Sequence, residues 1–294
     1  MVNPRMAPLA EILIFYSVWV GCDLTFYLAG LGISNGPPGV ATVFIVTMLL
    51  VLSSLSRRYR LCIEPYLESD HPLRILFLSV CILIFIAIYC GTIYLGLGGI
   101  LMSSIHAANL LFFACVAGHW LTLPLRRPAE LIPLCIVMSM VDVFSVFKGP
   151  TKEFTHAIAA HYNSGAAGRP PMVDFILVKL PLPGMSELMP VFGVVDWILI
   201  VMLSGAAAKF DMNDNLFGRD GKLYFSAAAL GLVFALLAAR GAGIYLPALP
   251  MIAVCFFVVV AYRSSVVLKL SRNELPAMIL AGVIACGVLI AVMR

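Results

Sequence analysis

The sequence predicts an all-α protein, a polytopic bundle of about nine transmembrane helices, on two observations. First, 62% of its 294 residues are hydrophobic and only 12% are charged, whereas an average soluble domain is about 25% charged. Second, the apolar residues gather in runs that approach the roughly 20 residues a helix needs to cross a ~30 Å hydrocarbon core. An open sheet cannot span lipid and the alternating pattern of a β-barrel is absent, so these runs are predicted to be helices.

The candidate spans follow one another along the chain. They lie at residues 9–33, 40–55, 75–97, 100–122, 129–147, 187–207, 223–239, 246–262 and 276–293. A turn-rich stretch at 35–39, with two Gly and two Pro, separates the first two spans and belongs to neither. No internal repeat is visible at a fixed period, so we expect one bundle of helices.

The 19 Lys and Arg residues indicate how the chain is oriented in a membrane. They sit in short loops and form no continuous patch, so the formal net charge of +4 does not predict nucleic-acid binding. Most of them fall on the side that carries the N-terminus, and the positive-inside rule places that side in the cytoplasm. The sequence therefore predicts a multi-pass integral membrane protein, surrounded by the lipid bilayer, with a cytoplasmic N-terminus and no removable signal peptide.

The sequence predicts no metal site, disulfide framework or cofactor. None of the eight cysteines has C-x-x-C spacing, and most lie inside predicted spans as small packing residues. Residues 211–221 are rich in Asp and Asn, as a calcium-binding loop is. However, Leu216 stands where such a loop needs Gly, and no bidentate Glu follows at the right spacing. This segment is predicted to be a solvated loop.

Two aspartates inside predicted spans are the strongest functional signal. A carboxylate at membrane depth costs several kcal/mol by insertion scales, so Asp142 and Asp196 are candidates for a functional site. At a helical rise of 1.5 Å per residue, they lie about 20 Å and about 16 Å from the cytoplasmic face. They sit on successive, antiparallel spans, so we expect the two carboxyls to share one depth and to meet.

A pair of carboxyls supplies a hydrolytic mechanism. Two such groups a few ångströms apart share one proton and titrate as a unit. The ionised member takes a proton from water, which attacks the scissile carbonyl, and the protonated member donates to the carbonyl oxygen. Asp142 and Asp196 are therefore predicted to be the catalytic dyad of an aspartic endopeptidase that cleaves within the membrane.

Two other functions fit the same residues. A lone intramembrane Asp is often part of a proton or ion path, so the pair fits a proton-coupled transporter. A transporter is expected to show broken helices in two repeated halves, and no repeat is visible. A non-catalytic binder of membrane helices is the second alternative. Asp23 also lies inside a predicted span and is given no role.

The one long connection, 148–186, contains a predicted strand. The stretch 172–181 is rich in β-branched and aromatic residues and is bounded by prolines. A helical substrate must unwind before it is cut, and pairing with a strand would satisfy its freed backbone groups. Phe175, Ile176 and Leu177 are therefore predicted to contact the substrate at an edge strand. An ordinary surface hairpin or a disordered loop is the alternative.

Three short motifs follow one another in the second half of the chain. Asp142 is followed by Val-Phe and then by Lys148-Gly-Pro150, Gly193-Val-Val-Asp196 comes next, and Pro247-Ala-Leu249 is followed by Pro250. In this order they resemble the presenilin and signal peptide peptidase family of GxGD-type intramembrane aspartyl proteases. The resemblance covers roughly residues 128–262. It departs from the family at Val141, where Tyr is usual, and at Val195, where Gly is usual.

The resemblance implies a presenilin-like helical bundle in three parts. Residues 1–127 would be supporting transmembrane helices, 128–262 the catalytic bundle with the loop 148–186, and 263–294 an additional C-terminal helix. It implies the Asp142/Asp196 dyad, and a substrate site shaped by Gly193, Pro247, Ala248 and Leu249. The implied substrates are transmembrane segments or signal-peptide remnants, and neither a metal nor a cofactor is needed.

Overall fold

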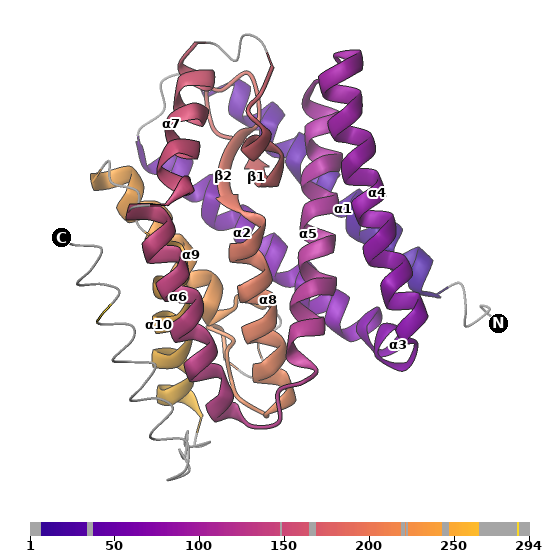
Figure 1. Cartoon of the computed structure of the whole chain (residues 1–294), viewed down its shortest axis with the longest axis vertical. Coiled ribbons are helices and arrows are strands. Elements are labelled where there is room, and N and C mark those ends of the chain that lie inside the picture. The colour runs from indigo at the N-terminus through magenta and orange to yellow at the C-terminus, as the bar shows by residue number, and fades with distance from the viewer. Residues whose placement is uncertain are drawn as a thin grey trace. The chain divides into compact units, whose positions relative to one another are not determined.

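In a computed structural model, the described residues are 7–33, 38–147, 149–164, 169–218, 221, 223–242, 247–264 and 287. Most of them are helical (Figure 1). Five helices are long and apolar enough to cross a membrane, as a multi-pass integral membrane protein requires. They are α1 (Ala7–Leu31), α2 (Pro38–Cys62), α4 (His71–Leu95), α5 (Ile100–Thr122) and α6 (Leu131–Phe147), which the 3₁₀ turn η1 (Pro128–Glu130) extends at its start.

Three further apolar helices are shorter than a full span. These are α8 (Val194–Lys209), α9 (Ala227–Ala242) and α10 (Ala248–Arg263), with 16 residues each, whereas a span needs roughly 20. The predicted last span, 276–293, lies outside the described residues apart from Gly287. Five of the predicted spans thus have the length and composition of membrane helices.

The predicted span 187–207 is wrong at its start. Residues Met189–Gly193 form a strand, β2, and the helix α8 begins only at Val194. Pro190 has no backbone N–H and disfavours a helix at this position. Asp196 therefore lies in the first turn of α8 and not in the middle of a long helix, so a depth calculated from helical rise does not apply to it.

The chain divides into two compact units. Unit 1 comprises Met1–Trp120 and Asp174–Val201, and unit 2 comprises Leu121–Val173 and Met202–Arg294. The segment 174–201 thus belongs to the same unit as the N-terminal helices.

Unit 1 has a core of aromatic and polar contacts between its helices. Trp19, Tyr59 and Phe112 are fully buried or nearly so, and the rings of Tyr59 and Phe112 meet edge to face at 5.8 Å. The Tyr16 hydroxyl of α1 donates to the Asn109 side chain of α5 at 3.1 Å. Such buried hydrogen bonds fix how neighbouring spans pack.

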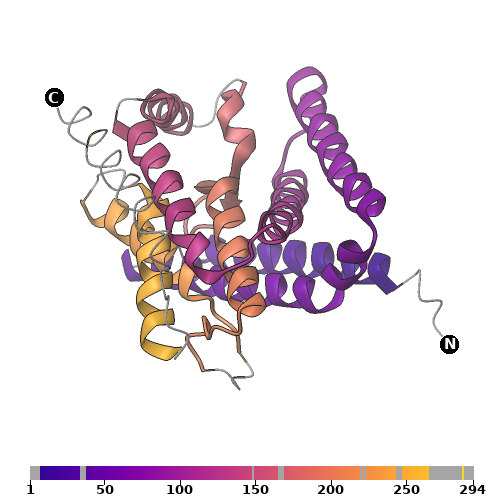
Figure 2. The ribbon, with the colours of Figure 1, turned by 60° about the horizontal axis from the view of Figure 1, so that its bottom comes forward.

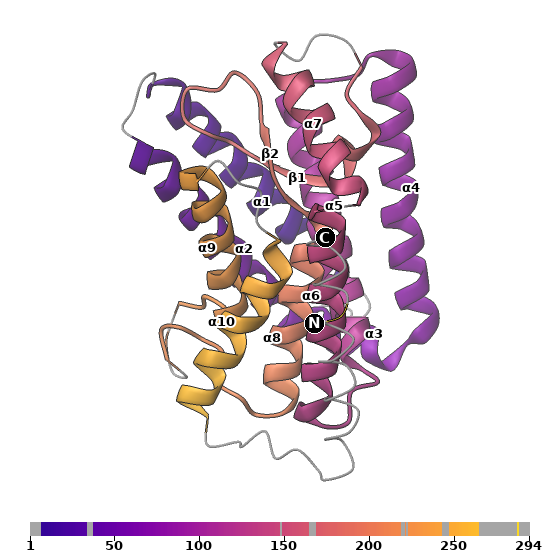
Figure 3. The same ribbon diagram turned by 60° about the vertical axis from the view of Figure 1, so that its left-hand side comes forward.

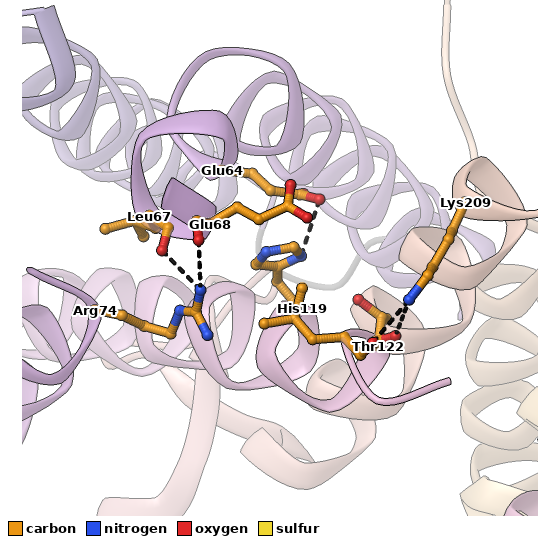
Figure 4. Close-up of polar contacts among 8 residues, drawn as sticks. Glu64, Leu67, Glu68, Arg74, His119, Thr122 and Lys209 are labelled. Carbon is orange, nitrogen blue, oxygen red and sulfur yellow. Dashed lines mark hydrogen bonds and ion pairs between the residues drawn. The ribbon is translucent and has the colours of Figure 1, made fainter. Parts of the chain in front are cut away.

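A short helix, α3 (Glu64–Ser69), connects α2 to α4, and buried polar side chains hold it in place (Figure 4). The Arg74 guanidinium donates to the Leu67 carbonyl oxygen at 2.7 Å, which satisfies an acceptor near the end of α3. The His119 ring lies with its Nδ1 atom 2.9 Å from a Glu64 carboxylate oxygen. This end of unit 1 is therefore fixed by side chains on three helices.

In unit 2, helices α9 and α10 lie side by side and pack closely against each other (Figure 3). A Cβ atom added at Gly231 of α9 would lie 2.4 Å from the Met251 carbonyl oxygen of α10. The two backbones can approach this closely only because Gly231 has no side chain. The same helix α10 also packs against α6.

The connection 148–186 is not structureless, because it contains a helix that the sequence did not predict. This helix, α7 (Pro150–Asn163), follows α6 after a tight turn at Gly149, where an added Cβ would lie 2.7 Å from the Ser145 Cα atom. In Figure 2, α7 is seen nearly end-on while α6 is seen from the side, so the two helices cross steeply. The same connection contains the 3₁₀ turn η2 (Met172–Ile176) and the strand β1 (Leu177–Leu180).

In the described part of the loop before α9, the prediction that the loop is solvated is wrong for two residues. Asp214 and Asn215 are only 6% and 5% exposed. The Asp214 carboxylate accepts from the Tyr224 hydroxyl at 2.6 Å and from Ser226 at 3.2 Å. Arg263, at the end of α10, donates to the Asn215 carbonyl oxygen. These polar contacts therefore join the loop before α9 to the end of α10.

Candidate active site

Asp142 lies on α6, and its carboxylate reaches the first turn of α10. Its Oδ2 atom accepts from the Leu249 backbone N–H at 3.0 Å, and the Ala248 N–H also hydrogen-bonds to this carboxyl. The first N–H groups of a helix have no partner within the helix, and its dipole favours an anion there. A carboxylate on α6 thus caps α10.

The local sequence explains why α10 takes its cap from another helix. Pro247, the residue just before the helix, has an extended backbone and makes no side-chain cap. Proline has neither an N–H nor a polar side chain to offer. Asp142 fills this role instead, so the structure brings Asp142 together with Pro247-Ala-Leu249 inside unit 2.

Asp196 holds the start of its own helix. Its Oδ2 atom accepts from the Gly193 backbone N–H at 2.9 Å. Gly193 is the last residue of β2, and Asp196 lies three residues further on, which is the spacing of a capping box. An added Cβ at Gly193 would lie 3.4 Å from the same Asp196 oxygen, which is an ordinary van der Waals distance. The hydrogen bond therefore fixes Asp196 at the junction between strand β2 and helix α8.

The neighbours of Asp196 point in different directions. Trp197 is completely buried, and its indole N–H donates to the Ser56 hydroxyl of α2 at 3.1 Å. Val195 is 49% exposed. The Trp197 side of the helix start is thus packed into unit 1, while Val195 is partly exposed.

The predicted strand at 172–181 exists but is shorter. Only β1 is extended, and it pairs antiparallel with β2, with Leu177 opposite Gly193 and an irregularity between Val178 and Lys179. Phe175 and Ile176 lie in η2. Phe175 is 6% exposed, whereas Ile176 is 45% exposed. Of the three residues predicted to contact a substrate, Ile176 and Leu177 are the ones with accessible surface.

The predicted site residues therefore form two clusters. In unit 2, Asp142 is joined to Ala248 and Leu249 by hydrogen bonds. In unit 1, Asp196 is joined to Gly193 and, through β2, to the hairpin that holds Leu177. Among the described residues, no group of three or more His, Cys, Asp or Glu side chains could hold a metal ion.

Sequence reasoning missed the capping roles of both aspartates. For Asp196 a signal was present, because a Gly three residues before an Asp at a helix start fits the capping-box spacing. For Asp142 no local signal exists, since its partner Leu249 is 107 residues away in the chain.

Comparison of this chain with family models, curated proteins and solved structures finds no match. What the chain does must therefore be inferred from its own residues and their geometry.

Proposed function

We propose that this protein is a divergent intramembrane aspartyl protease of the presenilin and signal peptide peptidase type. It would hydrolyse peptide bonds of transmembrane segments or signal-peptide remnants, with Asp142 and Asp196 as the dyad. The contact between the Asp142 carboxylate and the Leu249 N–H carries the proposal. Two motifs that the sequence singled out independently, 107 residues apart, converge at this contact.

The proposed chemistry needs the two carboxyls to share a proton. One takes a proton from water and the other protonates the carbonyl oxygen of the scissile bond, which gives a tetrahedral diol. The cap at α10 supports this role for Asp142, because the hydrogen bonds hold its carboxylate in one orientation. The Gly193 N–H does the same for Asp196. Such positioning is what a general acid or base requires.

The substrate would bind as an extended segment along the hairpin. Hydrolysis requires a helical substrate to unwind, and unpaired backbone groups in lipid cost several kcal/mol each. The outer edge of β1 would pair with the unwound segment. Leu177 lies opposite Gly193, whose N–H contacts Asp196. A substrate strand paired with the outer edge of β1 at Leu177 would thus lie two strand spacings, about 10 Å, from Gly193.

Asn variants separate the proposed chemistry from the capping role. The side-chain oxygen of Asn accepts the same N–H hydrogen bonds but cannot exchange a proton. We expect Asp142→Asn and Asp196→Asn each to lower cleavage of a model transmembrane substrate in proteoliposomes by about 100-fold or more. The thermal unfolding midpoint of each variant should stay close to that of the unmodified protein.

Binding of a diol-mimicking inhibitor provides the matching control. It should be measurable in the unmodified protein and weakened in both Asn variants. A folded Asn variant that retains most of the cleavage rate would show that the dyad is assigned wrongly. Inhibitor binding without any cleavage would favour a binder of membrane helices over a protease.

One observation favours the transporter alternative. Asp23 of α1 is completely buried, and its carboxyl is hydrogen-bonded to the Ser104 side chain of α5. Buried carboxyls inside membrane spans are typical of proton paths. Proton uptake into proteoliposomes that is lost in Asp23→Asn, with no cleavage of any substrate, would support a proton-coupled transporter.

A further inference from the structure

The β1–β2 hairpin is too small to hold its own position. It is a two-stranded sheet in which β1 has four residues and β2 has five, and an isolated hairpin of this kind is at best marginally stable. Its location must therefore be set by contacts with the helices of unit 1. These contacts matter because β2 leads directly into Gly193 and Asp196.

The first contact that anchors the hairpin comes from α5 and is made to η2, the turn that leads into β1 and forms the root of the hairpin. The His106 Nε2 atom lies 2.7 Å from the Phe175 carbonyl oxygen, and this contact is buried. A carbonyl oxygen only accepts, so Nε2 carries the proton and donates. The other ring nitrogen, Nδ1, is buried without a hydrogen-bond partner among the described residues. A neutral His106 ring with its proton on Nε2 fits both observations.

The aromatic ring of Phe175 strengthens the same anchor. It meets the Tyr89 ring of α4 nearly at right angles, with 4.9 Å between centroids, and the His106 ring at 6.0 Å. Edge-to-face contacts of this kind add to the burial of apolar area. Phe175 is thus inserted between two helices, with its backbone carbonyl fixed by His106.

A second anchor joins the root to the strand itself. Asp174 is 1% exposed and forms an ion pair with Lys179 of β1. Lys179 lies at the irregularity in the pairing of β1 with β2. The ion pair therefore ties the turn η2 to the point where the register of the strand changes.

The connection between the strands is held at the end of α1. The Gly184 N–H donates to the Gly30 carbonyl oxygen at 3.1 Å, and the Tyr27 hydroxyl donates to the Ser186 carbonyl oxygen at 3.0 Å. An added Cβ at Gly30 would lie 3.5 Å from Leu182. Both ends of the hairpin are thus fixed to helices of unit 1, with His106 as the anchor at the root.

We propose that His106 is a positioning residue that sets the register in which the hairpin presents a substrate to Asp196. It acts through the Phe175 carbonyl and does not touch the reacting atoms. This inference rests on the proposed protease function. If the carbonyl is released, η2 and β1 can shift along β2, and a substrate paired with β1 shifts with them. Cleavage would then occur at neighbouring peptide bonds.

The test is the distribution of cleavage sites, measured by mass spectrometry of the products from one transmembrane substrate. We expect His106→Leu to move part of the cleavage to neighbouring bonds. His106→Gln keeps an N–H donor and should restore the original sites. The matched control is His119→Leu, which changes a buried His on the same helix. A merely structural loss lowers the amount of active protein but leaves the sites unchanged, as expected for His119→Leu.

Hydrogen–deuterium exchange gives a second readout that does not depend on proteolysis. The amides of residues 177–180 should exchange faster in His106→Leu than in the unmodified protein, and at the unmodified rate in His106→Gln and His119→Leu. If no substrate is cleaved, the proposed function is wrong. The exchange experiment still tests whether His106 holds the hairpin in place.

Two results would overturn the proposal. One is unchanged exchange in a folded His106→Leu variant. The other is faster exchange with unchanged cleavage sites, which would mean that the anchor holds the hairpin without positioning the substrate. If His106→Leu does not fold, Lys179→Met tests the second anchor, and it too should shift the cleavage sites. Unchanged sites in that variant would contradict the proposed role of the hairpin register.

Discussion

Asp142 and Asp196 each stabilise the start of a helix, in addition to the chemistry we propose for them. Asp142 accepts from Leu249 at the start of α10, and Asp196 accepts from Gly193 at the start of α8. The sequence identified both residues because charge is rare in apolar runs. It did not predict the caps, because the partner of Asp142 is distant in the chain and the helix of Asp196 begins later than hydrophobicity indicates.

Val195 lies beside Asp196 and differs from the Gly that is usual at this position in the family that the motifs resemble. It is 49% exposed, so Val195→Gly removes no core packing and opens space next to Asp196. We expect the cleavage rate on a model transmembrane substrate to be retained or raised. The helix should lose only about 1 kcal/mol of stability, since glycine is a poor helix former.

Product analysis of this variant should be done alongside the rate measurement, because cleavage can shift to a neighbouring bond. A folded Val195→Gly variant that no longer cleaves would show that the branched side chain is required.

Hydrophobic runs predicted the long helices well and the irregular elements poorly. The run 100–122 coincides with α5, because Gly98 and Gly99 precede this helix and Pro124 follows it. The run 40–55 is too short, since α2 continues to Cys62 through Arg57, Arg58 and Arg60. Arg58 is accommodated there by two hydrogen bonds to the Glu11 carboxylate, at 2.8 and 3.1 Å. Apolar content alone cannot detect such a partner.

The strand β2 and the helix α7 were missed for opposite reasons. Met189–Gly193 is apolar like the helix that follows it, so hydrophobicity extended the helix across it. The helix α7 has too many polar residues for a span, so it was assigned to a loop. Short strands and amphipathic helices depend on tertiary contacts that a span search does not consider.

The packing of α9 against α10 gives a prediction with an internal control. Gly231→Ala places a Cβ 2.4 Å from the Met251 carbonyl oxygen, so the helices must separate. We expect a loss of about 1–3 kcal/mol in the free energy of unfolding, as for other overpacked sites. Gly241→Ala, on the same helix, meets nothing within 4 Å and should be neutral or slightly stabilising.

Thermal unfolding in detergent, followed by circular dichroism, compares the two variants directly. Equal unfolding midpoints for Gly231→Ala and Gly241→Ala would contradict the close approach of α9 and α10.

At the scale of the whole molecule, the five long apolar helices indicate a multi-pass integral membrane protein. The two aspartate clusters belong to different compact units. The orientation in the membrane stays a prediction of the charge distribution. The predicted orientation resembles that of signal peptide peptidases and is opposite to that of presenilins. Substrates whose N-terminus is cytoplasmic are then expected to be preferred.

A single cysteine tests this orientation. Ser164, at the end of α7, is exposed, and the charge distribution places it outside the cytoplasm. We expect Ser164→Cys to react with a membrane-impermeant maleimide added to right-side-out vesicles. Labelling only after the vesicles are opened would reverse the orientation. The unmodified protein, labelled in parallel, accounts for reaction at its own cysteines.

The cap that Asp142 provides to α10 bears on how an inactive form of this protein should be prepared. Substrate-trapping experiments often replace a catalytic acid with Ala. Here that change would leave the first N–H groups of α10 without an acceptor, and a bare helix N-terminus attracts phosphate, sulfate and carboxylate ions. An Ala variant would thus expose an anion-binding helix end that Asp142 occupies in the unmodified protein. The side-chain oxygen of Asp142→Asn still accepts from the first N–H groups of α10, so this variant is better suited to substrate trapping.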